Sequence, residues 1–262
     1  MKFNRINYNS LAKSYNKRYT ASPLEGIGKE IDKIANNLKP NRILEIGCGT
    51  GHWLKKISDS NSLLYGIDYS IGMLSQAKRY AKKSQMICAD ANNLPLKKNV
   101  FNFILCVNAI HHFTDPHKFI RSIKNIITHR GVVAIIGFDP RDPVTQWYLY
   151  EYFKGTYEFD LRRYPSFPDL ENWLSGCGFE NIELKITDNV NYELTNAAVL
   201  NDLFLRKEQA SQLAALSDNY YQKGLDKIKE VIKTSKQTGK DIVFPVRLVF
   251  KSLSAILYKY VS

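Results

Sequence analysis

The chain has few cysteines, and their arrangement excludes two classes of protein. Cys48, Cys88, Cys106 and Cys177 are the four cysteines among 262 residues. No two of them have the spacing of a metal site or of a redox pair, so we expect neither a disulfide framework nor a metal centre. Scattered free thiols are typical of a reducing compartment, which indicates a cytoplasmic protein.

The sequence also lacks a targeting or membrane-spanning segment of the usual kind. The first residues, MKFNRINYNSLAKSYNKRY, are polar and basic and have no apolar core, unlike a secretory signal. The most apolar late run, FPVRLVFKSLSAILYKYVS, is interrupted by Arg247, Lys251 and Lys259. This run is too short and too charged to cross a bilayer, so no membrane partner is expected.

Acidic residues are outnumbered by basic ones, and the formal net charge is +12. A basic balance can indicate a nucleic-acid partner. The lysines are, however, spread along most of the chain, in LAKSYNKRY, QAKRYAKKS and DKIKEVIKTSKQTGK. The net charge leaves RNA open as a partner. The sequence has no arginine-rich block and no recognisable RNA-binding module, and this favours a small molecule as the acceptor. The oligomeric state is left open.

Short apolar runs alternate with helical patterns from residue 24 to about residue 188. Val, Ile and Leu dominate most of the runs, as strands buried on both faces require. The predicted strands are Ile43–Glu45, Leu63–Ile67, Met86–Ala89, Phe101–Val107, Val132–Phe138 and Ile182–Ile186. The clearest predicted helices are SIGMLSQAKRYAKK, DPHKFIRSIKNII and PSFPDLENWLSGCGF. This alternation predicts an open, doubly wound α/β sheet with mostly parallel strands.

Two segments interrupt the alternation, so we divide the single predicted domain by its pattern. Residues 141–167 form an aromatic insertion, and residues 192–240 have the pattern of two or three helices without a strand. The full division is 1–39 as N-terminal helices or lid, 40–140 as core, 141–167 as insertion, 168–191 as continued core, 192–240 as helical cap and 241–262 as final strand region.

A glycine loop follows the first predicted strand in ILEIGCGTGH, residues 43–52. Glycines after a first strand let a nucleotide-like ligand approach the backbone at the carboxyl edge of the sheet. The spacing differs from the G-x-G-x-x-G of dinucleotide sites. Glu45 stands where the strand meets the loop and would repel a pyrophosphate. A cationic ligand would be attracted, and S-adenosylmethionine carries a sulfonium and an ammonium.

Acids also end the next two strands. Asp68 ends the second strand in YGIDYS, and its carboxylate suits two ribose hydroxyls, although it can also be a helix cap. Asp90 ends the third strand in ICADANNLPL and can accept a hydrogen bond from an adenine amino group. The backbone N–H of Ala91 can face the adenine ring.

These motifs resemble the class I S-adenosylmethionine-dependent methyltransferases, from residue 40 to about residue 138. The similar stretches are ILEIGCGTG, GIDYS, CADANNLPL, FNFILCVNAIHHF and FIRSIKNIITHRGVVAIIGF. The resemblance implies a Rossmann-like, seven-stranded sheet with a lid, and S-adenosylhomocysteine as product. It implies the following cofactor-binding set: Glu45, Gly47, Cys48, Gly49, Gly51, Asp68, Tyr69, Asp90, Ala91 and Asn108. Two scaffold positions depart from the family pattern: Asn102 replaces an aspartate, and HRG replaces a proline-glycine-glycine turn.

The acceptor side of the predicted site contains two histidines. His111 and His112 follow the fourth strand in NAIHHFTDP, and either can deprotonate an acceptor near neutral pH. Asp139 ends the neighbouring strand in GFDP and could orient an imidazole. We expect these three residues to be catalytic, with a preference for His111. One histidine of such a pair often only hydrogen-bonds its own loop.

Aromatic residues are concentrated in the insertion, which also contains Arg162 and Arg163. They include Trp147, Tyr148, Tyr150, Tyr152, Phe153, Tyr157, Phe159, Tyr164 and Phe167. The insertion is either a helix packed on the sheet or the aromatic wall of an acceptor pocket. Tyr8 and Tyr15 are seven residues apart, on one face of a predicted N-terminal helix. By resemblance this helix would fold over the cofactor as a lid.

Three functions remain open on sequence alone. The first is methyl transfer to O, N or C of a small metabolite. The second is methylation of RNA, since AIHHFT is similar to wobble-uridine-modifying enzymes and the chain is basic. The third is a regulatory protein that binds the cofactor without turnover. A closed aromatic chamber would favour the first, a broad positive face the second, and a pocket without room beside the methyl group the third.

Overall fold

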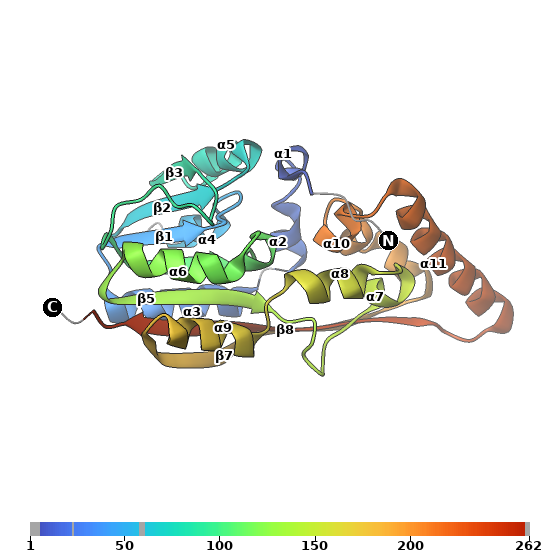
Figure 1. Cartoon of the computed structure of the whole chain (residues 1–262). Helices are drawn as coiled ribbons and strands as arrows, with labels where there is room; N and C mark the ends of the chain where they lie inside the picture. The colour runs from blue at the N-terminus through green and yellow to red at the C-terminus, as the bar shows by residue number, and fades with distance from the viewer. Residues whose placement is uncertain (1–5, 23, 58–60, 260–262) are drawn as a thin grey trace.

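The core of the protein is a parallel sheet (Figure 1). The computed structural model describes residues 6–22, 24–57 and 61–259. Five strands pair in parallel in the order β3-β2-β1-β4-β5, so the order reverses between β1 and β4. Their bounds are β1 Arg42–Ile46, β2 Leu63–Asp68, β3 Ser84–Cys88, β4 Phe101–Val107 and β5 Ile127–Phe138. The predicted doubly wound, mostly parallel sheet is confirmed.

Helices cover both faces of this sheet, because neighbouring residues on each strand point to opposite sides. Ile43 packs with α3, α4 and α5, whereas Leu44 packs with α6 and α9 on the opposite face. The helices are α3 Glu25–Leu38, α4 His52–Lys56, α5 Ile71–Tyr80, α6 Pro116–Ile126 and α9 Phe167–Gly176. No helix among the described residues is long and apolar enough to cross a membrane.

Side-chain caps fix where three of these helices begin. Ser70 accepts a hydrogen bond from the Met73 N–H at the start of α5, and Asp115 accepts one from the Lys118 N–H at the start of α6. Ser166 forms a capping box with α9. Helix α6 ends at Ile126, one residue before the end of the helix predicted from DPHKFIRSIKNII. Ile127 already pairs with Phe101 as the first residue of β5.

A long antiparallel pair, β7 (Phe179–Thr195) and β8 (Val243–Leu257), continues the sheet beyond β5. Residues 250–257 of β8 pair with β5, and the rest extend past its end. The prediction of a strand over 182–186 was too short, and residues 192–195 are strand, not helix. Their hydrogen-bonding partner is β8, more than 45 residues away in the sequence, which no local pattern reveals.

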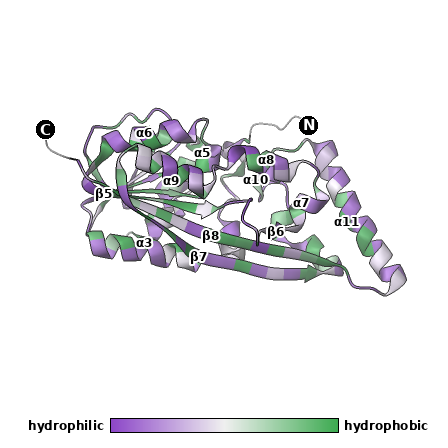
Figure 2. Ribbon diagram, turned by 60° about the horizontal axis from the view of Figure 1, so that its bottom comes forward, coloured by the Kyte–Doolittle hydropathy of each residue, from purple (hydrophilic) through white to green (hydrophobic). Residues whose placement is uncertain are grey.

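A cap is built on the extended half of this pair, at the end away from the helices of the sheet (Figures 1 and 2). Its parts come from the aromatic insertion and from the segment between β7 and β8. They are β6 Gln146–Trp147, α7 Tyr148–Tyr152, α8 Thr156–Arg163, η2 Asn196–Asn201, η3 Leu203–Leu205, α10 Ser211–Ala214 and α11 Asp218–Thr238. The N-terminal segment contributes α1 (Tyr8–Leu11) and α2 (Lys17–Ala21), and η1 (Ile110–His112) follows β4.

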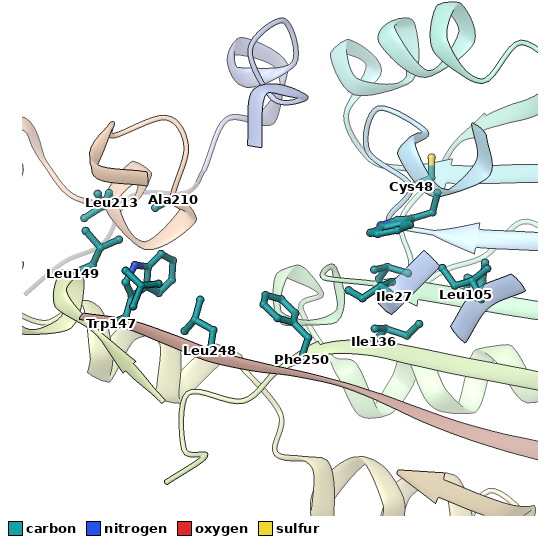
Figure 3. Close-up of a cluster of buried hydrophobic side chains, with 14 of the residues drawn as sticks. Ile27, Cys48, Leu105, Ile136, Trp147, Leu149, Ala210, Leu213, Leu248 and Phe250 are labelled. Atoms are coloured by element: carbon teal, nitrogen blue, oxygen red, sulfur yellow. The ribbon is translucent and has the colours of Figure 1, made fainter. Parts of the chain in front are cut away.

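One hydrophobic cluster runs from the sheet into the cap (Figure 3). Ile27 and Leu105 lie at its sheet end, and Trp147 and Leu213 lie at its cap end. Phe250 on β8 lies between the two ends. Because one continuous core joins the two parts, the cap is held in place by buried apolar surface.

Gly224 provides a test of this packing, because α11 contacts α7 there. A Cβ atom at position 224 would lie 2.2 Å from Cδ1 of Phe153, whose side chain is fully buried. Gly224→Ala should therefore lower the free energy of unfolding by roughly 1–3 kcal/mol, the usual cost of overpacking, although alanine favours helix. Chemical denaturation measures this difference. Gly176→Ala is the matched control, since a Cβ there meets nothing within 4 Å. A Gly224→Ala protein at least as stable as wild type would contradict the packing.

Candidate active site

A cavity of about 840 Å³ lies at the carboxyl edge of the parallel strands. The sheet loops, the N-terminal segment and the cap all line it. Such edges are where open α/β sheets bind ligands, at the point where strand order reverses. The volume lies in the upper part of the range of small-molecule sites, roughly 300–1,000 Å³. The cavity therefore has room for more than one small ligand.

The glycine loop lies at the sheet end of the cavity. Gly47 and Gly49 have positive φ angles of 72° and 53°, which L side chains rarely adopt. A Cβ at Gly47 would also lie 2.4 Å from Cβ of Ala109. The N–H groups of Gly47 and Cys48 both donate to the carbonyl of Ile67, at 2.8 and 2.9 Å. The sequence thus forms a tight turn that brings backbone to the cavity wall.

Glu45 is a buried acid at this turn. Its residue is 1% exposed, and its Oε2 has no hydrogen-bond partner among the described residues. Burial, and to a lesser extent the charge of Asp68, hold the pKa of Glu45 well above its ordinary value, against a backbone hydrogen bond from Leu54. An unpartnered carboxyl oxygen beside a cavity is costly unless a cation or donor approaches it. A ligand with an ammonium or sulfonium group meets that need.

The acids that end β2 and β3 also line the cavity. Asp68 accepts hydrogen bonds from the N–H groups of Gly49 and Ser70, both at 2.8 Å, so it fixes the glycine loop and the start of α5. Two bonds leave a carboxylate with further acceptor sites for hydroxyls. Asp90 is exposed to the cavity, and its Oδ1 accepts from the Asn92 N–H.

Nine of the ten predicted cofactor residues line the cavity: Glu45, Gly47, Cys48, Gly49, Asp68, Tyr69, Asp90, Ala91 and Asn108. Gly51 does not. It has a φ of 75° as the N-cap of α4, and a Cβ there would lie 3.0 Å from Cβ of Ala81. Its positive φ and the packing against α5 require a glycine there, and the predicted contact of Gly51 with the ligand gains no support from the cavity lining.

The predicted pairing of Asp139 with a histidine is also corrected. Asp139 lies outside the cavity lining. Its Oδ1 instead accepts from the backbone N–H and from Nη1 of Arg141, at 2.9 and 3.0 Å. A side chain that bonds a backbone N–H two residues ahead forms a local turn, and this turn directs the carboxylate away from the neighbouring strand's loop.

Both histidines line the cavity, but in different surroundings. His111 is 7% exposed, stacks on Tyr164 with ring centroids 4.0 Å apart, and has Nε2 3.2 Å from the Tyr164 hydroxyl. His112 presents accessible ring surface to the cavity. Its Nε2 lies 2.6 Å from the Tyr8 hydroxyl, and its Nδ1 lies 3.4 Å from Nη1 of Arg163.

These surroundings keep both imidazoles neutral near pH 7. Although His112 is accessible from the cavity, the protein around it desolvates the ring and lowers its pKa well below the usual value, and the charges of Arg163 and Arg18 lower it further. The pKa of His111 is likewise lowered well below its usual value, by burial and then by His112 and both arginines. A neutral imidazole can accept a proton.

The N-terminal segment is attached to the cavity rim at several points. Asn9 Oδ1 accepts from the Gly72 N–H and lies 2.8 Å from the Ser70 hydroxyl, at the start of α5. Asn16 accepts from the Thr50 hydroxyl in the glycine loop. The ring of Tyr19 stacks on His52 with centroids 3.6 Å apart. These contacts match the position of the expected lid, and both Tyr8 and Tyr15 line the cavity.

Only part of the aromatic insertion faces the cavity. Trp147, Phe159 and Tyr164 line it, whereas Tyr148 and Phe153 are buried inside the cap. The lining also includes Arg163 and the stretch 209–212, which lie in segments that the sequence proposed as walls of the acceptor chamber, the aromatic insertion and the helices of 192–215. Arg18 lines it too, and the sequence did not single out that residue.

The geometry fits S-adenosylmethionine at the sheet end of the cavity. Glu45 offers an unpartnered buried carboxyl oxygen to a cation, Asp68 and Asp90 offer acceptors, and the glycine loop gives close backbone approach. A dinucleotide would bring a pyrophosphate to the same loop, where Glu45 and Asp68 would repel it.

Comparisons with known proteins agree with this assignment. Residues 44–135 match the model of a methyltransferase domain. The chain is 25% identical over 161 residues to a ubiquinone biosynthesis O-methyltransferase of Coxiella burnetii, covering 56% of this chain and 67% of that protein. It is 27% identical over 158 residues to a tRNA U34 carboxymethyltransferase of Aliarcobacter butzleri, covering 58% and 51%.

Solved structures show the same fold. A proposed methyltransferase from an antibiotic biosynthesis pathway in Anabaena variabilis superposes with a TM-score of 0.62 at 21% identity, covering 86% of this chain and 96% of that one. The curated relatives are matched over shorter shares of their lengths, from 44% to 71%. Residues 44–135 therefore form a methyltransferase domain, and the chain has the fold of the class I S-adenosylmethionine-dependent methyltransferases.

Proposed function

We propose that the protein transfers a methyl group from S-adenosylmethionine to an O, N or C atom of a small-molecule acceptor, releasing S-adenosylhomocysteine. The observation that carries this proposal is one continuous cavity, which has acids at its sheet end and a chamber lined by aromatic side chains toward the cap. A cavity of about 840 Å³ leaves space for an acceptor beside the cofactor, which argues against a purely regulatory role.

The cofactor's place follows from its charges. Glu45 would hold the ammonium of the methionine part, Asp68 would accept from the ribose hydroxyls, and Asp90 would accept from the adenine amino group, with the Ala91 N–H beside the ring. When bound, S-adenosylmethionine supplies an electrophilic methyl group on a positively charged sulfur. The protein then has to align the acceptor with that methyl group and take up a proton.

RNA is the second candidate. The net charge of +12 and the similarity to a tRNA carboxymethyltransferase favour it. The attached N-terminal segment and the cap, however, surround the chamber with side chains, and an RNA base would have to be flipped out to enter it. The partly enclosed chamber with its aromatic lining supports the small-molecule reading.

Label transfer distinguishes the three functions. The purified protein is incubated with methyl-labelled S-adenosylmethionine and either a small-molecule extract of cells or total tRNA. We expect label in a low-molecular-weight product and S-adenosylhomocysteine in equal amount. Label in tRNA would establish the RNA reading instead. Tight cofactor binding with no label in either fraction would favour the regulatory protein.

The raised pKa of Glu45 leads us to expect that a proton is released when the cofactor binds. Its raised pKa means that the ligand-free protein holds a proton on this acid at pH values where an ordinary carboxyl is ionised. An approaching ammonium favours the ionised form, so binding removes that proton and affinity falls as pH falls through the raised pKa, by up to about tenfold per pH unit. Calorimetry in two buffers of different ionisation enthalpy measures the release.

Glu45→Gln is the control for this prediction. The amide keeps the shape and has no proton to lose, so the variant should bind more weakly and with the same heat in both buffers. Its ligand-free stability should be retained, because the amide oxygen can still accept from the Leu54 N–H and the amide has no charge to desolvate. Equal heats for the wild-type protein in the two buffers would refute the role of Glu45.

We further propose that His112 accepts the acceptor's proton. It presents ring surface to the cavity and bonds Tyr8 of the lid, whereas His111 is stacked on Tyr164. This choice differs from the sequence-based preference for His111. His112→Ala should lower the transfer rate by roughly 10²–10⁴-fold with little change in cofactor affinity. Tyr8→Phe should have a smaller effect in the same direction.

The pH profile gives a second measurement for His112. Since its pKa is lowered by burial and by Arg163 and Arg18, the neutral form persists as pH falls through about 6.5, the ordinary value. The initial rate of methyl transfer from labelled S-adenosylmethionine to the acceptor should therefore show no inflection at about pH 6.5. Full activity of His112→Ala, or loss of activity only in His111→Ala, would move the proton acceptor elsewhere.

A further inference from the structure

The charges that line the cavity are separated by sign. The three acids, Glu45, Asp68 and Asp90, lie at or next to the ends of β1, β2 and β3. The two arginines, Arg18 and Arg163, come from the N-terminal segment and from the cap. Among the described residues, the lid and the cap bring no carboxylate to the cavity wall. The cavity therefore has an acidic end that suits a cationic ligand and a basic end that a cationic ligand does not explain.

The charge of Arg163 is already balanced. Its Nη2 lies 2.7 Å from Oδ1 of Asp160, whose side chain is fully buried and also accepts from the Tyr150 hydroxyl. Nη2 of Arg163 also donates to Ser211, while Nη1 faces His112. Arg163 thus links the cap to the η1 segment that contains His111 and His112. Most of its hydrogen-bond donors are already used, so few are left for a further ligand.

Arg18 is not balanced in this way. Among the described residues no carboxylate forms an ion pair with it, and its partners are neutral. Nη2 donates to the carbonyl of Gln209 at 2.8 Å, and the guanidinium carbon lies 3.8 Å from the ring centroid of Tyr15. Its Nε is inaccessible to solvent and has no hydrogen-bond partner. A half-buried guanidinium with an unpartnered Nε and no anion beside it is costly, and an anionic ligand would reduce that cost.

We propose that the acceptor carries an anionic group, a carboxylate or a phosphate, which binds to Arg18 at the cap end of the cavity. This inference rests on the proposed function, since it names the substrate class of the same site. A guanidinium presents donors in a planar fork that suits such oxyanions. The body of the acceptor would lie against the apolar lining, which includes Phe204, Leu248 and Phe250.

The competing anion is the carboxylate of the cofactor itself. Three observations place Arg18 on the acceptor side. It bonds Gln209 of the cap, it stacks on Tyr15 of the lid, and its charge acts on the pKa values of His111 and His112, which mark the acceptor side. Glu45, which would hold the cofactor's ammonium, has its pKa set by burial, the Leu54 N–H and Asp68.

The test uses three aromatic probes on protein saturated with S-adenosylhomocysteine. They are 4-hydroxybenzoate, phenyl phosphate and methyl 4-hydroxybenzoate, the neutral ester of the first. Calorimetry should show that the wild-type protein binds at least one of the anionic probes at least tenfold more tightly than the ester. The comparison of the two anions tells carboxylate from phosphate. Equal affinities, or no detectable binding of either anion, would overturn the proposal.

Variants connect the selectivity to Arg18. Arg18→Gln should lose the tenfold preference, and Arg18→Lys should keep part of it. Lys17→Gln is the matched control, because Lys17 is an exposed cation on the same helix and does not line the cavity. An Arg18→Gln protein that keeps the anion preference but binds S-adenosylhomocysteine weakly would assign Arg18 to the cofactor's carboxylate and overturn the inference.

Two measurements distinguish a failure of this inference from a failure of the proposed function on which it rests. If the wild-type protein fails to bind S-adenosylhomocysteine at all, the proposed function fails. If it binds the cofactor product but shows no preference for anions, only the acceptor class fails. The comparison of charged and neutral probes needs the wild-type protein alone, so it stands even where a variant at position 18 does not fold.

Discussion

The pairing of β7 with β8 is the interaction on which the rest of the molecule depends. Along residues 250–257, β8 completes the sheet against β5, and its other half carries β6 and the remaining length of β7 beyond the sheet. The cap is attached to that extension, and the hydrophobic cluster follows β8 from one part to the other (Figure 3). Without the extended pair, the chamber toward the cap would lose the part of its lining that Tyr192, Val246 and Leu248 supply.

The side chains at the two ends of the cavity are positioned in different ways. Its acidic end depends on strand ends and tight turns, where backbone geometry leaves little freedom, as at Gly47. Its basic end depends on side chains from segments far apart in the sequence, as in the bond from Arg18 to Gln209, 191 residues away. The first kind suits a ligand common to a family, and the second allows the acceptor to differ between relatives that share the fold.

The two kinds differ in how far the sequence predicts them. Glu45, Asp68 and Asp90 follow short apolar runs, so strand ends and their shared edge could be predicted from local patterns. The length of β7 could not, because its polar residues, such as Asn189 and Asn191, have low strand propensity and are held by β8. Adjacent strand ends suggested that Asp139 meets a histidine, yet a local turn with Arg141 determines the direction of that side chain.

The N-terminal segment touches both ends of the cavity, and this has a thermodynamic consequence. Asn9 attaches it at α5 and Asn16 at the glycine loop, while Tyr8 bonds His112 and Arg18 bonds Gln209 of the cap. A ligand at one end that orders this segment lowers the entropy cost of ordering it for the ligand at the other end. Cofactor and acceptor should therefore bind with positive cooperativity, and linkage requires that each raises the affinity for the other by the same factor.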